Sequence, residues 1–433
     1  MPISDKSALM LGWEFPPRMV GGLAIATYGI VEAMSHFMKI HLVIPFKDET
    51  TPVIPNVTIY GLNTIEQDFK KAPIRSVLNK KTTILSFTEI HSYPLVFEEG
   101  VEYLETEEVE IIEEGEHKPF HSHLEVFNSP EMYGKGLWDK LPVYSEIVNE
   151  IAGLIDFDIV HCHDWVTFGA GKKIKATYHK PLCLHVHALE TDRAYKTIRN
   201  DIYEIEHSAM QMADLIFPVS QYTKEQIIEN YEISGDKIIP IYNAIDEKLI
   251  RRWKHKIPER IVTFLGRITA QKGPEYLFET AQKVVTAYPN VKFVIAGNGD
   301  QMAQLIAASA DKQISQHFIF MGFVSREDVD ALLATSDVYF MPSVSEPFGL
   351  TALEATRAGV PCVLTKQSGA AEVLPSALTA DYWNTDLFAE HILKLLSNED
   401  FRQNIIKENQ KEMNKISWYA SAARIVEEYA VIL

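Results

Sequence analysis

The sequence contains little cysteine, no long hydrophobic run and no excess of positive charge. Each of its three cysteines lies inside an apolar segment (Cys162, Cys183 and Cys362), which suits small buried side chains better than disulfides. No apolar run approaches the roughly 20 residues that a membrane-spanning helix needs, and the first residues lack the basic and apolar regions of a signal peptide. These absences predict a cytoplasmic protein without an integral membrane segment.

The charge balance restricts the partners. The formal net charge is −18, from 59 acidic and 41 basic residues. A nucleic-acid-binding protein needs a basic face to neutralise phosphates, so this balance argues against DNA and RNA. At 46% hydrophobic and 23% charged, the 433 residues have the composition of a folded chain long enough for two or three domains.

Alternating strand and helix patterns predict an α/β fold. Amphipathic helices such as 21–37, 199–213 and 221–230 separate short apolar segments that we interpret as strands, at 7–13, 39–45, 157–163, 181–187, 215–220 and 237–243. This alternation is typical of a mostly parallel sheet with helices on both faces.

The alternation of strands and helices begins again after a polar stretch at 243–259, which we interpret as a hinge. Helices follow at 273–288, 301–310, 325–335 and 350–358, and strands are predicted at 260–267, 291–300, 317–324, 337–343 and 360–365. The pattern predicts a second doubly wound unit. Three helical segments follow it, and the last of them, 417–433, is apolar enough to need a packing partner.

The segment 98–116 departs from this pattern because it carries ten glutamates interleaved with Val, Tyr, Leu and Ile. Near-alternation of this kind favours a solvated hairpin inserted in the first domain. An acidic docking surface is the alternative.

Two doubly wound sheets bind ligands at the carboxyl ends of their strands. In the first unit, Gly21 and Gly22 follow the first strand, where glycine lets a backbone N–H group approach a phosphate; a simple tight turn is the alternative. The dinucleotide fingerprint G-x-G-x-x-G is absent there, which argues against NAD and FAD. In the second unit, Arg267 and Lys272 of "GRITAQKG" follow a strand, and both are phosphate-binding residue types.

The stretch "SEPFGLTALEA" (345–355) follows another predicted strand and leads into a helix. If the helix begins near Gly349, the amide groups of Gly349, Leu350 and Thr351 form an anion site, and we include Phe348 of the same loop in the predicted binding residues. The carboxylates of Glu346 and Glu354 then lie on either side of this site, and each can accept two hydroxyl donors. One would hold a ribose and the other a hexose.

Together these motifs resemble a known family, the retaining GT-B glycosyltransferases of group 1 or family 4. The spacing from Glu346 to Glu354 matches the E-x7-E signature of that family, "GRITAQKG" matches its Arg-x4-Lys clamp, and "IYNAID" (241–246) is similar to its N-G-[IV]-D segment, with Ala244 replacing glycine. The stretches "LGWEFPPRMVGGLA", "HCHDW" and "HVHALE" are similar to the glycogen and starch synthase branch. The resemblance covers nearly the whole chain.

The resemblance implies two Rossmann-like domains that face a cleft. Residues 1–243 would bind the acceptor and would be packed by the helix 417–433, whereas residues 244–416 would bind the nucleotide sugar. It implies transfer of a glucosyl unit from a donor such as ADP-glucose or UDP-glucose to a glucan or other saccharide, with no cofactor and no metal. One departure is Met19, which occupies the position of the lysine in the usual Lys-x-Gly-Gly loop.

The resemblance also implies roles at the matched positions. Arg267, Lys272 and the backbone of Gly22 would hold the leaving diphosphate, and Glu354 would hold the ribose. The residues implied to hold the transferred sugar or the nucleobase, or to line the site, are Glu346, His187, Asn243, Asp164 and Phe323. Phe323 is the candidate for stacking on the base. The developing charge on the diphosphate would be stabilised by these cations and helix N–H groups.

Three other functions stay open on the sequence. The first is a family 4 transferase that acts on a lipid-linked or surface-glycan acceptor. The second is a sugar-nucleotide 2-epimerase, against which the E-x7-E pattern argues. The third is a non-catalytic sensor of sugar nucleotides, which the full set of site residues disfavours.

Two motif types could instead indicate metal. His-x-His pairs occur at 121/123, 161/163 and 185/187, and such spacing on a strand places both rings on one face, as in a zinc site. No third ligand follows from the spacing, so we favour local hydrogen bonds or the sugar site. The Asp-x-Asp segments 156–158 and 328–330 precede a predicted strand and lie within a predicted helix, so we interpret both as incidental.

Overall fold

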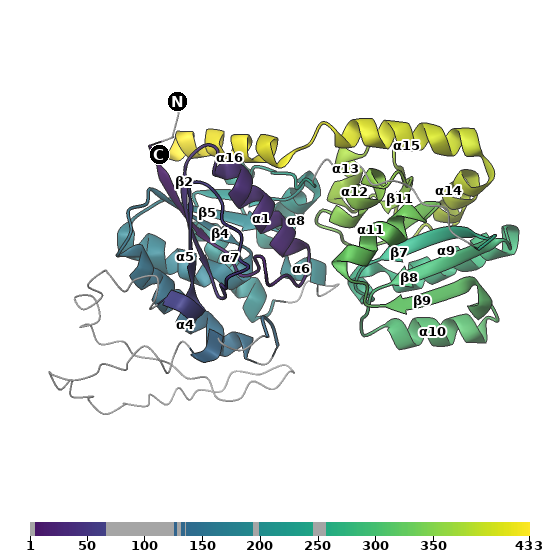
Figure 1. Cartoon of the computed structure of the whole chain (residues 1–433), viewed down its shortest axis with the longest axis horizontal. Coiled ribbons are helices and arrows are strands. Elements are labelled where there is room, and N and C mark those ends of the chain that lie inside the picture. Colours follow the sequence, from purple (N-terminus) through teal and green to yellow (C-terminus); the bar gives the residue numbers. More distant parts are fainter. Residues whose placement is uncertain (1–4, 66–124, 128–130, 135, 194–198, 246–256) are drawn as a thin grey trace.

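The computed structural model describes residues 5–65, 125–127, 131–134, 136–193, 199–245 and 257–433. The glutamate-rich segment 98–116, the His121/His123 pair and most of the predicted hinge at 243–259 lie outside the described residues. Within the described residues, the chain forms two six-stranded parallel sheets with helices around them (Figure 1).

The two sheets share one strand order. The first is ordered β3-β2-β1-β4-β5-β6 and the second β12-β11-β10-β7-β8-β9, so each begins in the middle and extends outward in both directions. The first comprises β1 (Ser7–Leu11), β2 (Lys39–Ile44), β3 (Val57–Gly61), β4 (Ile159–His163), β5 (Leu182–Val186) and β6 (Leu215–Pro218). The second comprises β7 (Arg260–Leu265), β8 (Val291–Ala296), β9 (Phe318–Gly322), β10 (Val338–Met341), β11 (Cys362–Thr365) and β12 (Leu378–Ala380). The predicted pair of doubly wound Rossmann-like units is confirmed.

Helices cover both faces of each sheet. Around the first sheet lie α1 (Gly22–Met34), α4 (Leu137–Ala152), α5 (Trp165–Tyr178), α6 (Glu190–Arg193), α7 (Asp201–Met212) and α8 (Gln221–Tyr231). Around the second lie α9 (Pro274–Ala287), α10 (Met302–Asp311), α11 (Arg326–Ala334), α12 (Leu350–Arg357), α13 (Gly369–Val373), α14 (Thr385–Ser397) and α15 (Glu399–Met413). Alternate β1 residues enter different cores, with Leu9 in one and Met10 in the other, because both faces of the strand are covered.

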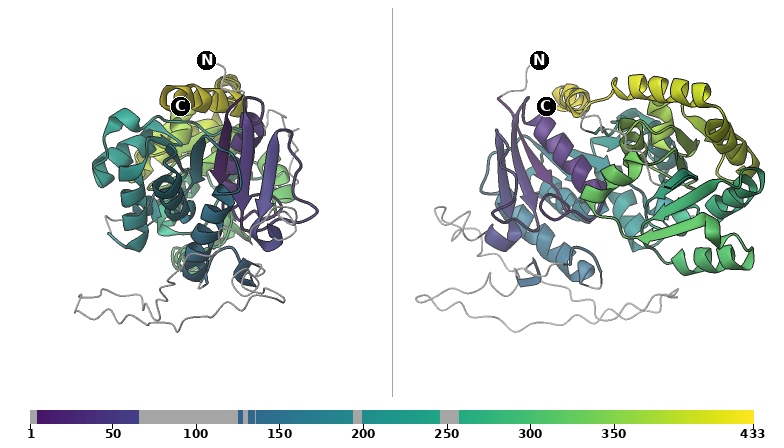
Figure 2. Two further views of the ribbon diagram at one scale, coloured as in Figure 1. Left: turned by 90° about the vertical axis from the view of Figure 1, so that its left-hand side faces the viewer. Right: turned by 45° about the vertical axis from the view of Figure 1, so that its right-hand side comes forward.

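The last helix, α16 (Trp418–Ile432), returns from the second unit to the first and lies against α1 (Figures 1 and 2). The indole of Trp418 packs so closely on Gly29 that a Cβ atom at Gly29 would lie 2.3 Å from the ring. The hydroxyl of Ser421 donates to the carbonyl of Tyr242 at 2.6 Å. These contacts tie the end of the chain to the first sheet.

One predicted strand is wrong. Residues 237–243 form only an isolated bridge between Ile238 and Ile216 beside β6. Ile239 and Ile241 donate their amide groups to the carbonyls of Ile216 and Pro218. Pro218 has no N–H group and cannot donate a hydrogen bond to residues 237–243, so a full parallel ladder between them and β6 cannot form. Strands β3 and β12, which the sequence patterns did not single out, complete the sheets instead.

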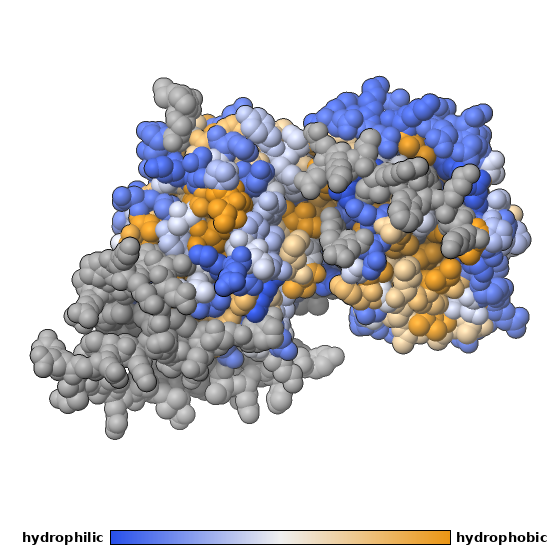
Figure 3. Space-filling model, in the orientation of Figure 1, coloured by the Kyte–Doolittle hydropathy of each residue, from blue (hydrophilic) through white to orange (hydrophobic). Residues whose placement is uncertain are grey.

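The surface reflects this layering. The outer side of α15 is hydrophilic, whereas apolar side chains gather over the edge strand β9 and the adjacent α10 (Figure 3). They include Ile306, Ile319 and Met321. In the described part of the chain, no helix has the length and apolarity to cross a membrane.

Candidate active site

The N-terminus of a helix in the first unit lies next to the N-terminus of a helix in the second unit. Helix α1 begins at Gly22 and α12 begins at Leu350, and a Cβ atom on Gly22 would lie 3.3 Å from Cδ1 of Leu350. Gly349 takes the left-handed conformation at φ 97° just before α12, which favours glycine there. Within the described ranges, the amide groups of Gly349, Leu350 and Thr351 donate to no protein acceptor. Both helix dipoles therefore favour an anion at this point.

A buried glutamate that the sequence analysis missed holds the loop before α1. Glu14 is 4% exposed, and its Oε2 accepts the amide groups of Val20 and Gly21, each at 3.0 Å. Its other oxygen accepts the hydroxyl of Tyr133. Gly22 therefore follows a loop that is fixed from inside the first domain. The side chain of Met19 is 45% exposed.

Lys272 and Glu346, 74 positions apart, form an ion pair. Nζ of Lys272 donates to Oε2 of Glu346 at 2.6 Å, and the hydroxyl of Ser343 donates to the same oxygen at 2.9 Å. The amide of Glu346 donates to the carbonyl of Gln367 at 2.9 Å. The glutamate side chain is only 10% exposed, so these contacts fix its orientation. The predicted anion-binding cation and the predicted sugar-binding carboxylate thus lie in direct contact.

Arg267 follows β7 and is exposed. Its loop crosses the loop after β8 so tightly that a Cβ atom on Gly297 would lie 1.8 Å from the carbonyl oxygen of Gly266. A Cβ atom on Gly299 would lie 2.2 Å from the carbonyl oxygen of Ile268. The stretch "GNGD" (297–300), an incomplete nucleotide fingerprint in the sequence, therefore serves to let two loops pack together. The two glycines of this stretch are the sequence signal that could have predicted the close approach of another backbone segment.

The other predicted residues of the second unit occupy different environments. Phe323 follows β9 and is 79% exposed, as a stacking surface requires, whereas Glu354 is 2% exposed on α12. The hydroxyl of Thr351 bonds to that of Tyr339 at 2.6 Å. The ring of Phe348 belongs to the hydrophobic core, so only the backbone of Phe348 can face a ligand.

In the first unit, Asp164 and His187 follow the neighbouring strands β4 and β5. Oδ1 of Asp164 accepts the amide of His187 at 2.8 Å and that of Ala188 at 3.3 Å. Burial raises the pKa of Asp164. We therefore interpret Asp164 as the group that positions the His187 loop. Asn243 is 4% exposed, and its buried side-chain oxygen has no hydrogen-bond partner among the described residues.

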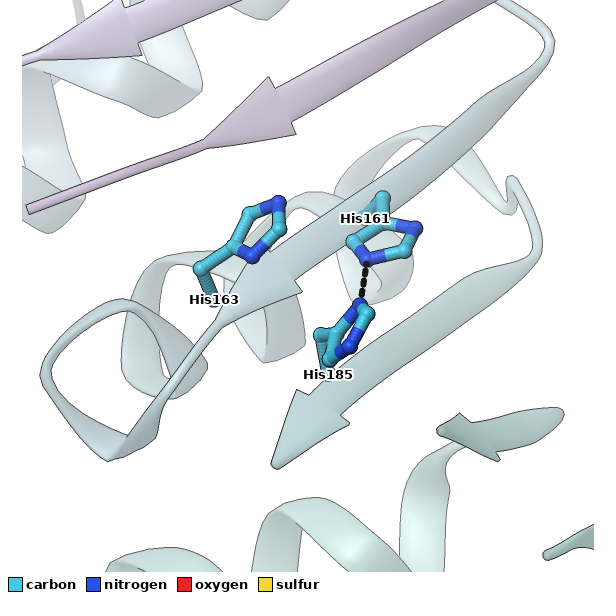
Figure 4. Close-up of side chains that lie close together, drawn as sticks. All are labelled: His161, His163 and His185. Atoms are coloured by element: carbon cyan, nitrogen blue, oxygen red, sulfur yellow. Dashed lines mark hydrogen bonds between the residues drawn. The ribbon is translucent and has the colours of Figure 1, made fainter. Parts of the chain in front are cut away.

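Four histidines, three in β4 and β5 and one directly after β5, lie side by side. The β4–β5 register pairs His163 with His185. Nε2 of His161 hydrogen-bonds Nδ1 of His185 at 3.2 Å, as Figure 4 shows, and Nδ1 of His163 bonds Nε2 of His187 at 3.1 Å. The hydroxyl of Tyr429 on α16 contacts Nδ1 of His161. Burial lowers the pKa of all four rings, that of His187 to about 3, which keeps them neutral.

His161, His163 and His185 are also the residues that could hold a metal, since their candidate ligand atoms lie within 4.8 Å of one another. Two nitrogens on one zinc ion, at bonds of about 2.0–2.1 Å, can be no more than about 4.2 Å apart. The group would have to contract to bind an ion. Hydrogen bonds between the rings account for part of the cluster and orient His187. Nε2 of His163, Nε2 of His185 and Nδ1 of His187 have no partner among the described residues. The Asp-x-Asp segments lie where predicted, before β4 and within α11.

Residues of the first unit also hold the loop that carries Glu346. The hydroxyl of Ser220 donates to the carbonyl of Pro347 at 2.6 Å, and the hydroxyl of Tyr222 bonds that of Ser345 at 2.9 Å. Ser345 also donates to Asp192, whose pKa is raised by burial. No motif pointed to these contacts, because each joins residues more than 120 positions apart.

Two doubly wound parallel sheets, joined by contacts between loops at their carboxyl edges, have the architecture of the GT-B fold. Residues 246–412 match the family model for glycosyl transferases group 1, and residues 101–249 match that for glycosyltransferase family 4. An uncharacterized glycosyltransferase of Methanocaldococcus jannaschii is 30% identical over 304 residues, which cover 65% of this chain and 77% of the relative. The chain therefore belongs to the group 1 glycosyltransferases.

More distant relatives include a glycogen synthase of Mycobacterium tuberculosis, 26% identical over 231 residues that cover 51% of this chain and 55% of the relative. Among solved structures, sucrose-phosphate synthase from Thermosynechococcus elongatus aligns with a TM-score of 0.68 at 15% identity over 99% of both chains. The catalytic domain of starch synthase IV from Arabidopsis thaliana, bound to ADP and acarbose, aligns with a TM-score of 0.65 at 14% identity over 98% of both chains. At these identities the structural matches establish the fold.

Proposed function

We propose that the protein is a retaining, metal-independent α-glycosyltransferase that moves a glucosyl unit from a nucleotide-diphosphate sugar to a glucan or other saccharide. The observation that carries the proposal is the position of the Lys272–Glu346 pair on the loops that flank the converging N-termini of α1 and α12. This arrangement offers positive charge for a diphosphate next to a carboxylate for sugar hydroxyls.

In the proposed reaction, the bond between the anomeric carbon and the diphosphate oxygen breaks while a bond to an acceptor hydroxyl forms on the same face. Negative charge develops on the leaving diphosphate. Arg267, Lys272 and the N–H groups of the two helices stabilise that charge. The departing phosphate oxygen takes the proton of the acceptor hydroxyl, so no separate nucleophile is required.

On the sugar side, Glu346 accepts hydroxyl donors, and His187 and Asn243 approach from the first unit. The neutral state of His187 suits a hydrogen bond to a sugar hydroxyl. Glu354 holds the ribose and Phe323 stacks on the base. The catalytic domain of starch synthase IV, which has the same fold and is bound to ADP and acarbose, supports a nucleotide-diphosphate donor.

A donor screen tests the proposal. Thermal shifts with ADP-, UDP- and GDP-sugars identify the donor, and NMR of the product with maltooligosaccharides reports the anomeric configuration. We expect an α-linked product and loss of transfer in Glu346→Gln and Lys272→Ala. Lys292→Ala is the control, because Lys292 pairs with Glu259 at the opposite end of the sheet. Inverted product, or wild-type turnover in either site variant, would refute the assignment. A changed sugar nucleotide without acceptor would indicate an epimerase.

A further inference from the structure

Three aromatic side chains form a cluster at the carboxyl edge of the second sheet. The rings of Tyr276 and Tyr382 lie 5.1 Å apart at 65°, and those of Tyr382 and Trp383 lie 4.7 Å apart at 86°. Tyr276 is on the first turn of α9, and the other two follow β12. Trp383 is 58% exposed. We call these three residues the aromatic platform.

The platform is attached to the loop of Glu346. Gln367 connects them, since its side-chain Oε1 accepts the amide of Tyr382 at 3.4 Å and its main-chain carbonyl accepts the amide of Glu346 at 2.9 Å. On the other side, Tyr276 packs over Gly273, which directly follows Lys272; a Cβ atom on Gly273 would lie 3.2 Å from the tyrosine ring. The platform therefore belongs to the same rigid edge as the Lys272–Glu346 pair.

The strand order places the platform relative to a bound donor. Along the edge, Phe323 follows β9, Arg267 and Lys272 follow β7, Glu346 follows β10 and Trp383 follows β12. A donor whose base stacks on Phe323 after β9 and whose sugar contacts Glu346 after β10 has its sugar end directed toward β12. Adjacent strands are about 4.8 Å apart, so β12 lies about 10 Å beyond β10. Tyr276 lies next to the Lys272 loop, and Trp383 extends the platform toward the β12 side of Glu346.

We propose that the aromatic platform is a subsite for sugar units of the acceptor, on the far side of the transfer centre from the nucleotide. This inference rests on the proposed function. Flat aromatic faces bind the C–H faces of sugar rings at low conformational cost, since the rings here already hold one another. Asp381 supplies polar contacts beside them; its hydrogen bond from Gln367 lowers its pKa, so its carboxylate is charged and can accept sugar hydroxyls.

Kinetics of Trp383→Ala test the subsite with the donor and saccharide acceptor found in the screen above. We expect the acceptor KM to rise tenfold or more, with the donor KM changed less than about twofold. Trp383→Phe keeps a flat ring and should recover most of the loss. Tyr419→Ala is the control, because Tyr419 is equally exposed, at 58%, on the distant α16. An unchanged acceptor KM, or an effect on the donor KM alone, would overturn the subsite while the proposed function stands.

If the wild-type protein transfers nothing from any donor, the proposed function fails, and the platform is then judged by binding alone. Saturation-transfer NMR with maltoheptaose should show contacts that Trp383→Ala removes and Tyr419→Ala retains. Absence of a Trp383-dependent signal would overturn the subsite. Loss of binding to phospholipid vesicles in Trp383→Ala, without a change toward saccharides, would also overturn it and would indicate a membrane contact.

Discussion

The buried histidines should make the protein less stable in mild acid. His161, His163 and His185 are 0% exposed, and burial lowers their pKa values well below that of a free imidazole. The native state therefore excludes protons that the unfolded chain binds below its pKa of about 6.5. Because the unfolded state binds more protons in this window, the free energy of unfolding falls as the pH falls through 6.5.

The size of the effect follows from the direction of the shifts. At pH 5.5, one imidazole that stays neutral in the native state and has a pKa of about 6.5 when unfolded costs about 1.4 kcal/mol. The same residue costs less than about 0.1 kcal/mol at pH 7.5. Three such residues remove about 4 kcal/mol between these pH values. That is a large part of the roughly 5–15 kcal/mol that stabilises a typical domain.

Urea unfolding at pH 7.5 and 5.5 measures the loss, and one substitution isolates the part due to histidine. Carboxylates also titrate, so we compare the difference between the two pH values in His163→Asn and in the wild type. The variant should lose about 1.4 kcal/mol less on acidification, since one proton site is gone. His36→Asn, whose side chain is 59% exposed, serves as the control and should behave as the wild type. Equal pH dependence in all three proteins would refute the reasoning.

Further predictions concern the anion site and the return of α16. Lys272→Ala should lower the affinity for a nucleoside diphosphate by about 10- to 150-fold, as measured by calorimetry, because a charge-assisted hydrogen bond is worth about 1.5–3 kcal/mol. The affinity for the free nucleoside should not change. Equal losses of affinity for both ligands would contradict the assignment. Gly29→Ala should lower the melting temperature, because the new Cβ would lie 2.3 Å from the Trp418 indole. Gly169→Ala, in the helix α5 with no atom within 4 Å, should leave it unchanged or raise it, and similar shifts in both would argue against the clash.

Most of the fold was readable from local patterns. The second sheet shows this best, since β7 to β11 and the α-helices between them lie within the segments predicted for them, except that α10 ends one residue later, at Asp311. Parallel strands are buried on both faces and therefore read as continuous apolar runs. The pattern failed at 237–243, because an apolar run does not reveal that its neighbour in space, Pro218, cannot complete a ladder.

The sequence by itself determined which residue types follow each strand, because the ends of strands and the starts of helices are set by local propensity and glycine. Arg267, Lys272 and Glu346 were predicted as site residues in this way, and Glu354 was predicted from its spacing to Glu346. Only the tertiary structure decided how they meet: that Lys272 binds Glu346, and that the ring of Phe348 faces the core.

Only the tertiary structure brings the two His-x-His pairs at 161/163 and 185/187 together into one buried cluster. Each pair has a local period, but the contact between His161 and His185 depends on the β4–β5 register. The register between two parallel strands depends on how the long connection between them packs and on how helices cover both faces of the sheet. The local spacing of residues carries no information on this packing.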